Sequence, residues 1–228
     1  MKVIIFGDSH VNALCENIHV LDGHDTELVI NHGLNWVSPH FEDEAGGIRV
    51  RADAVENVEP LDMLLQPGGR HYFSSILHTA PYTRAADWRR FRPWSVMGDF
   101  PRLQPVSDAV LQTWVAREIA VRLAFLSELR AKGFDIRVIE APRPLERAPA
   151  LHVIDPDVMA RVDTICRDFI KMRLARAGIR VIGVPRETLS GAFTAEAYSA
   201  ERLADPHHGN LEYGRLTMLR ILDDLTTA

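Results

Sequence analysis

The stretch that decides the fold is KVIIFGDSH, residues 2–10, at the start of the chain. After the lysine, KVIIF is continuously apolar, which predicts a strand buried on both faces, because a half-exposed strand alternates apolar and polar residues. The strand then runs into four residues that a hydrophobic core does not use: Gly7, Asp8, Ser9 and His10. Ligands of open parallel sheets bind outside the carboxyl ends of the strands. These four residues therefore either turn the chain or carry chemistry.

Further strands and helices follow the first strand in alternation. Four short runs are predicted to be strands: TELVI (26–30), HYFSSIL (71–77), DIRVIEA (135–141) and IRVIGV (179–184). One helix is expected from Ser107, its N-cap, to Gly133, and another from the cap Asp155 and Pro156 to Gly178. Strands joined through helices imply right-handed crossovers and a parallel sheet covered on both faces. The sequence thus predicts an α/β protein with a three-layer α/β/α architecture and a mainly parallel, five-stranded sheet.

Length and composition are those of an ordinary globular chain. It has 228 residues, of which 46% are hydrophobic and 25% are charged. We expect one domain over residues 1–228. Two stretches, at about 34–69 and 80–106, are longer than usual strand-to-helix loops and are predicted to be insertions.

Charge, cysteine spacing and hydropathy argue against several protein classes. A net charge of −5 gives no reason to expect nucleic-acid binding, which needs a basic face. Cys15 and Cys166 lack the spacing of a disulfide framework or a structural zinc site. No segment has the roughly twenty apolar residues of a membrane-spanning helix, and VIIF is too short for a signal-peptide core. We expect a cytoplasmic protein without a membrane span, and we leave its oligomeric state open.

A second polar motif, ADPHHGNLEYG, lies near the end of the sequence. A serine is a poor nucleophile unless a histidine takes its proton and a third group orients that histidine. Asp205 and His208, three positions apart, can supply both functions for Ser9, and His207 is the competing base. The alternative is that both motifs are helix caps, with Asp8 or Ser9 capping HVNALCENI and the late motif capping the final helix.

Together, the FGDSH and DPHHGNLEYG blocks resemble the SGNH, or GDSL-type, hydrolase family. The resemblance implies a flavodoxin-like fold and a serine esterase that works through an acyl-enzyme. Ser9 would be the nucleophile, His208 the base and Asp205 the group that orients it. The family resemblance implies no metal and no organic cofactor. It implies a small-molecule or glycan ester as substrate, such as an O-acyl group on a carbohydrate.

The family's oxyanion hole is matched only in part. Members use the backbone N–H of the nucleophile, a glycine after the second strand, and an asparagine in a G-x-N-D block after the third. The Ser9 N–H and Gly33 match the first two positions, but the third strand runs into SSILHTAPYT, without G-x-N-D. His78 or Thr79 would have to replace the asparagine, unless these two residues simply end the strand. A lost donor costs roughly two to three orders of magnitude in rate.

The second insertion interleaves aromatic residues with arginines. Such rings can cover an acyl chain or stack on a sugar, so Tyr82 and Trp94 are candidate substrate contacts, together with Asp8 and His10. The alternative is a satellite core of aromatic rings below a solvated face of arginines.

Two other functions compete with the esterase. Asp8 and His10 match the D-x-H that opens calcineurin-like metallophosphoesterases, in which both residues bind a metal. Their further blocks are missing, since Arg102 occupies the position of the second aspartate in MGDFPRL and HHGN is not G-N-H. We therefore expect no metal site. A non-catalytic glycan- or ligand-binding module on a decayed hydrolase fold is the third possibility.

Overall fold

A parallel sheet forms the centre of the molecule. The computed structural model describes residues 2–30, 40–53, 59–98, 100–201, 205 and 207–227. Within them, five strands pair in the order β10-β9-β6-β1-β2, and every pairing between neighbours is parallel. These strands are β1 (Lys2–Gly7), β2 (Asp25–Ile30), β6 (Gly69–Phe73), β9 (Asp135–Ile139) and β10 (Arg180–Ile182). Counted along the chain, the order is 2-1-3-4-5, which is the flavodoxin-like order. The predicted fold class and the five predicted strands are confirmed.

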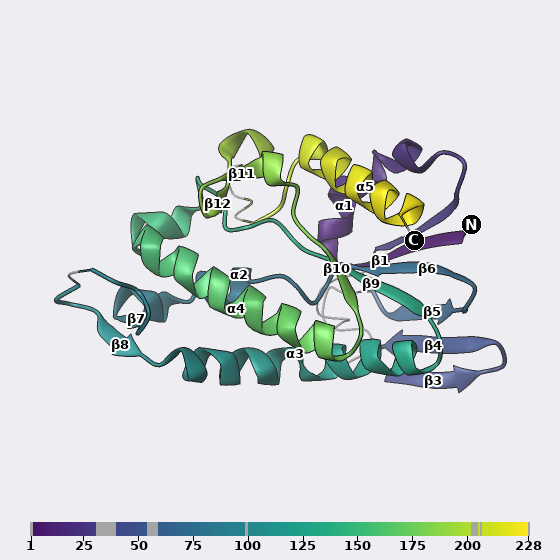
Figure 1. Ribbon diagram of the computed structural model, residues 1–228, viewed down its shortest axis with the longest axis horizontal. Helices are drawn as coiled ribbons and strands as arrows, with labels where there is room; N and C mark the ends of the chain where they lie inside the picture. Colours follow the sequence, from purple (N-terminus) through teal and green to yellow (C-terminus); the bar gives the residue numbers. More distant parts are fainter. Residues whose placement is uncertain are drawn as a thin grey trace.

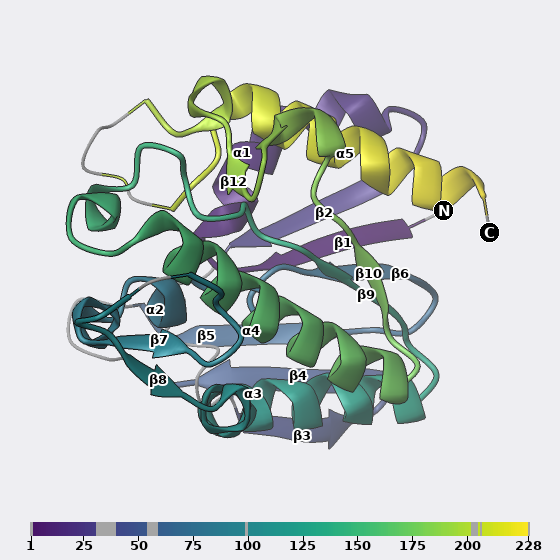
Figure 2. The same cartoon turned by 60° about the vertical axis from the view of Figure 1, so that its left-hand side comes forward.

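Helices cover both faces of this sheet. The four α-helices involved are α1 (Asn12–Cys15), α3 (Asp108–Ala131), α4 (Pro156–Arg176) and α5 (Leu211–Thr226). Figures 1 and 2 show α1 and α5 on one side of the sheet and α3 and α4 on the other. Ser107 caps α3 by accepting from the N–H of Ala109, and Asp155 caps α4 by accepting from the N–H of Asp157. Both helices therefore begin where the sequence predicts.

The first strand is buried on both faces, as its composition predicts. Val3 and Ile5 belong to the apolar cluster on the α5 side. Ile4 and Phe6 belong to the larger cluster on the side of α3 and α4. Because successive side chains point to opposite faces, a strand between two helical layers must be apolar at every position.

The first insertion adds a second sheet. Its three strands are antiparallel: β3 (His40–Glu44), β4 (Gly47–Ala52) and β5 (Leu61–Leu65). Ile48 and Val50 are fully buried in the same cluster as α3, and the ring of Phe41 lies 5.7 Å from that of Phe125. This insertion therefore enlarges the core on the α3 side, away from α5.

The second insertion is a compact lobe with a short parallel pair. Its elements are α2 (Ala80–Thr83), η4 (Ala86–Arg89), β7 (Phe91–Pro93) and β8 (Gln104–Val106). Tyr82 and Trp88 are buried, whereas Trp94 is 72% exposed. Arg92 lies over the ring of Phe100, 5.7 Å from its centroid. Tyr82 and Trp88 belong to the same core cluster as residues of α3 and α4, so these rings extend the main core and do not form a satellite core.

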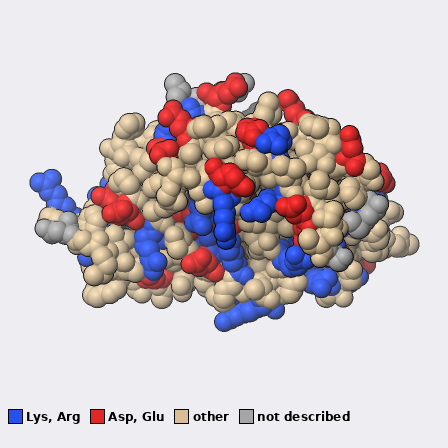
Figure 3. Space-filling view, turned by 45° about the horizontal axis from the view of Figure 1, so that its top comes forward, with Lys and Arg blue, Asp and Glu red and all other residues tan. Residues whose placement is uncertain are grey.

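Short elements make up most of the remaining described chain. They are the 3-10 turns η1 (Ser9–Val11), η2 (Ile18–Leu21), η5 (Pro149–His152), η6 (Arg186–Thr188) and η7 (Glu196–Tyr198), and the strands β11 (Leu189–Ser190) and β12 (Phe193–Thr194). Figure 3 shows lysine and arginine interspersed with aspartate and glutamate over one face of the molecule. No helix in the described part of the chain is long and apolar enough to cross a bilayer.

Candidate active site

Ser9 is positioned by the end of β1. Gly7 has a φ of 153°, and a Cβ there would lie 2.2 Å from the Oγ of Ser74, so the close approach of these two segments requires glycine. Asp8 then caps η1, because its carboxylate accepts from the N–H of His10 at 3.1 Å. The predicted helix HVNALCENI is in fact divided into η1 and the short α1. Asp8 thus performs the capping role, and Ser9 is left at the carboxyl edge of the sheet.

His208 is positioned by the turn that starts α5. Its carbonyl accepts from the N–H of Ala200 at 3.0 Å. Asn210 caps α5 by accepting from the N–H of Tyr213 at 3.0 Å. A Cβ at Gly209 would lie 2.5 Å from the ring of Tyr213. The G-N-x-x-Y part of the late motif therefore fixes the backbone beside His208.

A close contact between α1 and α5 joins the two ends of the chain. A Cβ at Gly214 would lie 1.7 Å from the carbonyl oxygen of Ala13, so a side chain there would force the helices apart. Asn17 donates to the carbonyl of Leu211 at 2.9 Å, which links the segment after α1 to the start of α5. Through these contacts, segments about two hundred residues apart in sequence meet at one edge of the sheet.

Ser9, His208 and Asp205 form one hydrogen-bonded chain. The Oγ of Ser9 lies 2.8 Å from the Nε2 of His208. The Nδ1 of His208 lies 2.8 Å from Oδ2 and 2.9 Å from Oδ1 of Asp205. A carboxylate at Nδ1 fixes the tautomer that leaves the Nε2 lone pair facing the serine. The structure brings these three predicted residues together.

Asp205 is a charged acceptor in this arrangement. Burial alone would raise the pKa of its carboxyl group, but hydrogen bonds from the N–H of His207 and from His208 outweigh burial and lower that pKa. The two N–H groups lie 3.2 Å and 3.1 Å from Oδ1. The side chain of Asp205 is 24% exposed. The carboxylate is therefore ionised over the neutral pH range.

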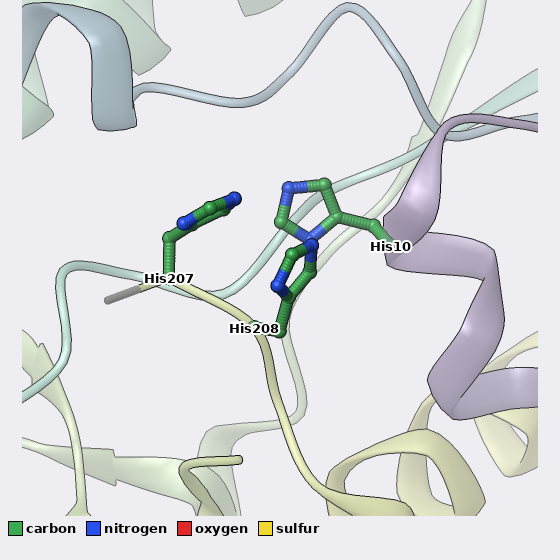
Figure 4. Close-up of side chains that lie close together, drawn as sticks. All are labelled: His10, His207 and His208. Carbon is green, nitrogen blue, oxygen red and sulfur yellow. The ribbon is translucent and has the colours of Figure 1, made fainter. Parts of the chain in front are cut away.

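Three further histidines form a cluster with His208. The ring of His10 lies 4.7 Å from that of His208 and 4.4 Å from that of His78, between centroids. The ring of His207 lies 4.1 Å from that of His208 and is stacked on His78 at 5.1 Å. Figure 4 shows His10 coming from η1, while His207 and His208 come from the segment before α5.

These histidines are neutral and carry ring nitrogens without partners. The Nε2 of His10, the Nε2 of His78 and the Nδ1 of His207 are shielded from solvent, and none has a hydrogen-bond partner in the described part of the chain. Burial, followed by the charge of His208, lowers the pKa of His10 and of His207 to about 3. Burial, followed by the charge of His10, lowers the pKa of His78 well below its usual range. Sequence reasoning proposed separate roles for these residues and missed that they form one cluster.

Asp8 lies on the buried side of this cluster. It is 6% exposed, and burial raises the pKa of its carboxyl group despite the hydrogen bond from His10. The hydroxyl of Ser74 also donates to it at 3.4 Å. Asp8, His10 and His78 bring one ligand atom each to within 4.8 Å of the others.

Thr79 points away from this cluster, which corrects its expected role. Its hydroxyl donates to Asp163, which is fully buried on α4, and accepts from Arg167 at 3.2 Å. Since its hydrogen is already used, this hydroxyl is not available to stabilise an oxyanion. His78 is left as the side chain in this loop with an unused ring nitrogen.

A hollow of about 440 Å³ opens beside Ser9, and we call it the Ser9 hollow. Its lining residues are Ser9, His10, Asn12, Ala13, Glu16, Pro142, Ala200, Glu201, Asp205, His208, Gly209, Asn210, Leu211 and Tyr213. Sequence reasoning missed Glu16, Glu201 and Pro142. Pro142 could have been predicted, because it follows β9 and ligands of parallel sheets bind beyond the carboxyl ends of the strands.

Two of the expected substrate contacts lie elsewhere. Tyr82 is buried against Trp114, with ring centroids 5.1 Å apart, and Trp94 is exposed on the lobe of the second insertion. Neither is among the described residues of the Ser9 hollow. The structure therefore does not bring these aromatic rings to Ser9, because Tyr82 packs against α3 and Trp94 faces solvent. Gly33 lies outside the described residues, so its expected role stays a prediction.

Comparisons with known proteins find distant structural likenesses. No protein-family model matches the chain. No curated protein matches it either. Among solved structures, a GDSL-like lipase from Bacteroides thetaiotaomicron is 9% identical, with a TM-score of 0.48, over 98% of this chain and 87% of that one. An acetyl xylan esterase is 11% identical, with a TM-score of 0.45, over 99% and 100% of the two chains.

A DUF4886 family protein from Bacteroides uniformis is similar to the same degree. It is 13% identical, with a TM-score of 0.48, over 100% of this chain and 83% of that one. The TM-scores of all three structures lie below 0.5, so these likenesses carry no argument about activity. What this chain does must be inferred from its own side chains.

Proposed function

We propose that this protein is a serine esterase of the SGNH type, with Ser9 as nucleophile. One observation carries the proposal: the 2.8 Å approach of the Oγ of Ser9 to the Nε2 of His208, whose Nδ1 lies equally close to Asp205. A nucleophile, a base and an orienting carboxylate within hydrogen-bond reach are what a hydroxyl needs to attack a carbonyl at neutral pH.

The reaction proceeds in two steps. Ser9 attacks the ester carbonyl while the Nε2 of His208 takes its proton, and the same proton then passes to the departing alcohol. Water repeats the sequence on the acyl-enzyme, with His208 again the base and Ser9 the leaving group. Throughout both steps Asp205 keeps Nδ1 protonated and stabilises the imidazolium that forms.

The oxyanion of each tetrahedral intermediate needs hydrogen-bond donors. We assign this role to the backbone N–H of Ser9 and to the Nε2–H of the His78 ring, with Gly33 as the third predicted donor. His78 is neutral at pH 7 and its Nε2 is unused, so the tautomer protonated there is a donor without a competing partner in the described structure. A neutral donor in a buried place stabilises developing negative charge more than the same group in water does.

The lining of the Ser9 hollow favours a neutral ester. Glu16, Glu201 and Asp205 place carboxylates around the opening, and they repel a phosphate or carboxylate substrate. Asn12 supplies an amide group suited to a hydroxyl. An O-acyl group on a carbohydrate, or another small neutral ester, fits this lining best.

Hydrolysis of p-nitrophenyl acetate tests the proposal. We expect wild-type protein to release p-nitrophenol and Ser9→Ala to lose this turnover by at least about a thousandfold. Ser190→Ala is the matched control, because Ser190 is an exposed serine whose hydroxyl bonds to Glu146. It should retain wild-type turnover.

Two outcomes of this assay would reject the esterase. Turnover that survives Ser9→Ala would assign the chemistry to another group. A folded wild-type protein that hydrolyses neither this ester nor an acetylated sugar would favour the non-catalytic binding module.

A further inference from the structure

The histidine cluster beside Ser9 has the composition of a metal site. One ring nitrogen each of His10, His207 and His208 lies within 4.8 Å of the others. Figure 4 shows the three rings converging from two segments of the chain. Two imidazole nitrogens bound to one zinc ion are about 3.4 Å apart, given Zn–N bonds of about 2.1 Å. The nitrogens lie within 4.8 Å of one another, so zinc binding requires them to approach by not much more than about 1 Å.

Nitrogens of two of these three histidines lack hydrogen-bond partners in the described structure. The Nε2 of His10 and the Nδ1 of His207 are shielded from solvent and accept or donate no hydrogen bond within the described residues. Asp205 does not satisfy His207, because its Oδ1 lies 3.9 Å from that Nδ1, beyond hydrogen-bond distance. An unpaired buried polar atom costs free energy, and a cation that binds these nitrogens would remove that cost.

His208 completes the set with an orienting carboxylate already in place. Zinc-bound histidines commonly donate their other N–H to a carboxylate, which fixes the ring and its tautomer. Asp205 makes this contact at 2.8 Å. The tautomer that serves Ser9 therefore also presents the Nε2 lone pair of His208 to a metal.

We propose that His10, His207 and His208 bind Zn²⁺, and that zinc bound there inhibits the esterase by occupying the Nε2 of His208. The inhibition, though not the binding, rests on the function proposed above. A lone pair bound to zinc cannot accept the proton of Ser9, so the two uses of His208 exclude each other. The Ser9 hollow, lined by His10 and His208, gives the ion a path from solvent.

The ligand set selects the metal. Three imidazoles with an open fourth position suit zinc and related first-row cations, whereas magnesium and calcium prefer oxygen ligands. With three protein ligands, a water molecule would be the fourth ligand.

Direct titration tests binding without reference to activity. We expect calorimetry with zinc chloride to give one saturable site in wild-type protein and in Ser9→Ala, and magnesium chloride to give none. His207→Gln should weaken zinc binding at least tenfold, while His152→Gln, which changes an exposed histidine of η5, should not. Cobalt(II) should give the intense visible absorption of tetrahedral coordination. Absence of a saturable site, or equal affinity in the two histidine variants, would overturn the proposal.

Turnover under the same conditions tests the inhibition. We expect zinc at saturating concentration to abolish p-nitrophenyl acetate hydrolysis and EDTA to restore it. Activity that EDTA removes and zinc restores would reject inhibition in favour of a metal-dependent reaction. If Ser9→Ala leaves turnover intact, the proposed esterase fails, while the calorimetric titration still decides whether the three histidines bind zinc.

Discussion

The two ends of the parallel sheet differ in how their buried polar groups are partnered. Near the amino ends of the strands, Asp224 is 5% exposed and is surrounded by arginines. It lies 3.2 Å from Arg70, 3.2 Å from Arg137 and 3.0 Å from Arg180, and it accepts from the hydroxyl of Tyr72 at 2.9 Å. At the carboxyl ends, the histidines beside Ser9 keep buried nitrogens without partners in the described structure.

This difference separates a structural role from a chemical one. A buried carboxylate paired with several arginines fixes how α5 lies against the sheet. Several unpaired nitrogens gathered in one place are costly, and we interpret this cluster as a site for catalysis or for a ligand. The comparison predicts that substitutions at the carboxyl ends impair activity and that substitutions at the amino ends impair stability.

His208→Gln should have the largest effect, and it should fall on activity. We expect kcat/KM to drop roughly 10⁴-fold, because the base is lost, while the free energy of unfolding changes by about 1 kcal/mol or less. Steady-state kinetics and urea denaturation measure the two quantities. His152→Gln is the control and should match wild type in both. A variant as active as this control would remove His208 from the mechanism.

Asp224→Asn should have the next largest effect, on stability alone. Loss of the carboxylate removes one of the two counterions that Arg70 and Arg137 share and leaves them Asp135 alone, which costs about 3 kcal/mol of unfolding free energy. The neighbouring Asp223 is exposed, so Asp223→Asn is a matched control with little expected change. Urea denaturation measures the difference. If the folded fraction of Asp224→Asn loses kcat/KM as strongly as His208→Gln does, the division between the two ends is wrong.

Gly214→Ala should have a smaller effect on both properties. The added Cβ would overlap the carbonyl of Ala13, which forces α5 from α1 and costs about 1–3 kcal/mol. The same shift moves His208 from Ser9, so kcat should fall too. At Gly183 a Cβ would meet no atom closer than the Oε2 of Glu140 at 3.6 Å, so Gly183→Ala should be tolerated. Thermal unfolding and kinetics of the pair provide the test, and equal melting temperatures would contradict the close packing.

The smallest effect concerns pH. His207 has a pKa of about 3 when folded, against an ordinary 6.5, so between these values the unfolded chain binds a proton that the folded protein does not. Its contribution to stability is therefore complete above pH 6.5 and is lost as the pH falls toward 3. As the pH falls, the unfolding free energy of His207→Gln should decrease less steeply than that of wild type, by up to about 1.4 kcal/mol per pH unit. Urea denaturation between pH 7 and pH 4 measures the slope, and a slope that matches His152→Gln would show that His207 titrates normally.

The fold could be predicted from the sequence because its signals are local. The five parallel strands follow from short runs of apolar, β-branched residues, and α3 and α4 follow from Ser107, Asp155 and the glycines beyond their ends. The approach of Ser9 to Asp205 and His208 could be expected as well. Both motifs border helices at the carboxyl edge of a parallel sheet.

What could not be predicted depends on contacts distant in sequence. Thr79 donates to Asp163, 84 positions later, and nothing in the local sequence indicates this contact. Asp163 and Arg167 form a buried ion pair on α4, but they do not disturb its helical pattern of apolar residues. His78 and His207 come from different loops, so their stacking follows only from the packing of the chain. The lobe that carries Trp94 buries Tyr82 and Trp88 in the same core as α3, and the interleaving of aromatic residues and arginines does not indicate this continuity.

Labelling with a fluorophosphonate probe tests the central assignment most directly. The probe phosphonylates a serine only where a base activates it, and mass spectrometry of the digested protein locates the adduct. We predict a single adduct on Ser9 in wild type and in Ser190→Ala, and none in His208→Gln. An adduct on another serine, or labelling of Ser9 that is unchanged in His208→Gln, would contradict the activation of Ser9 by His208.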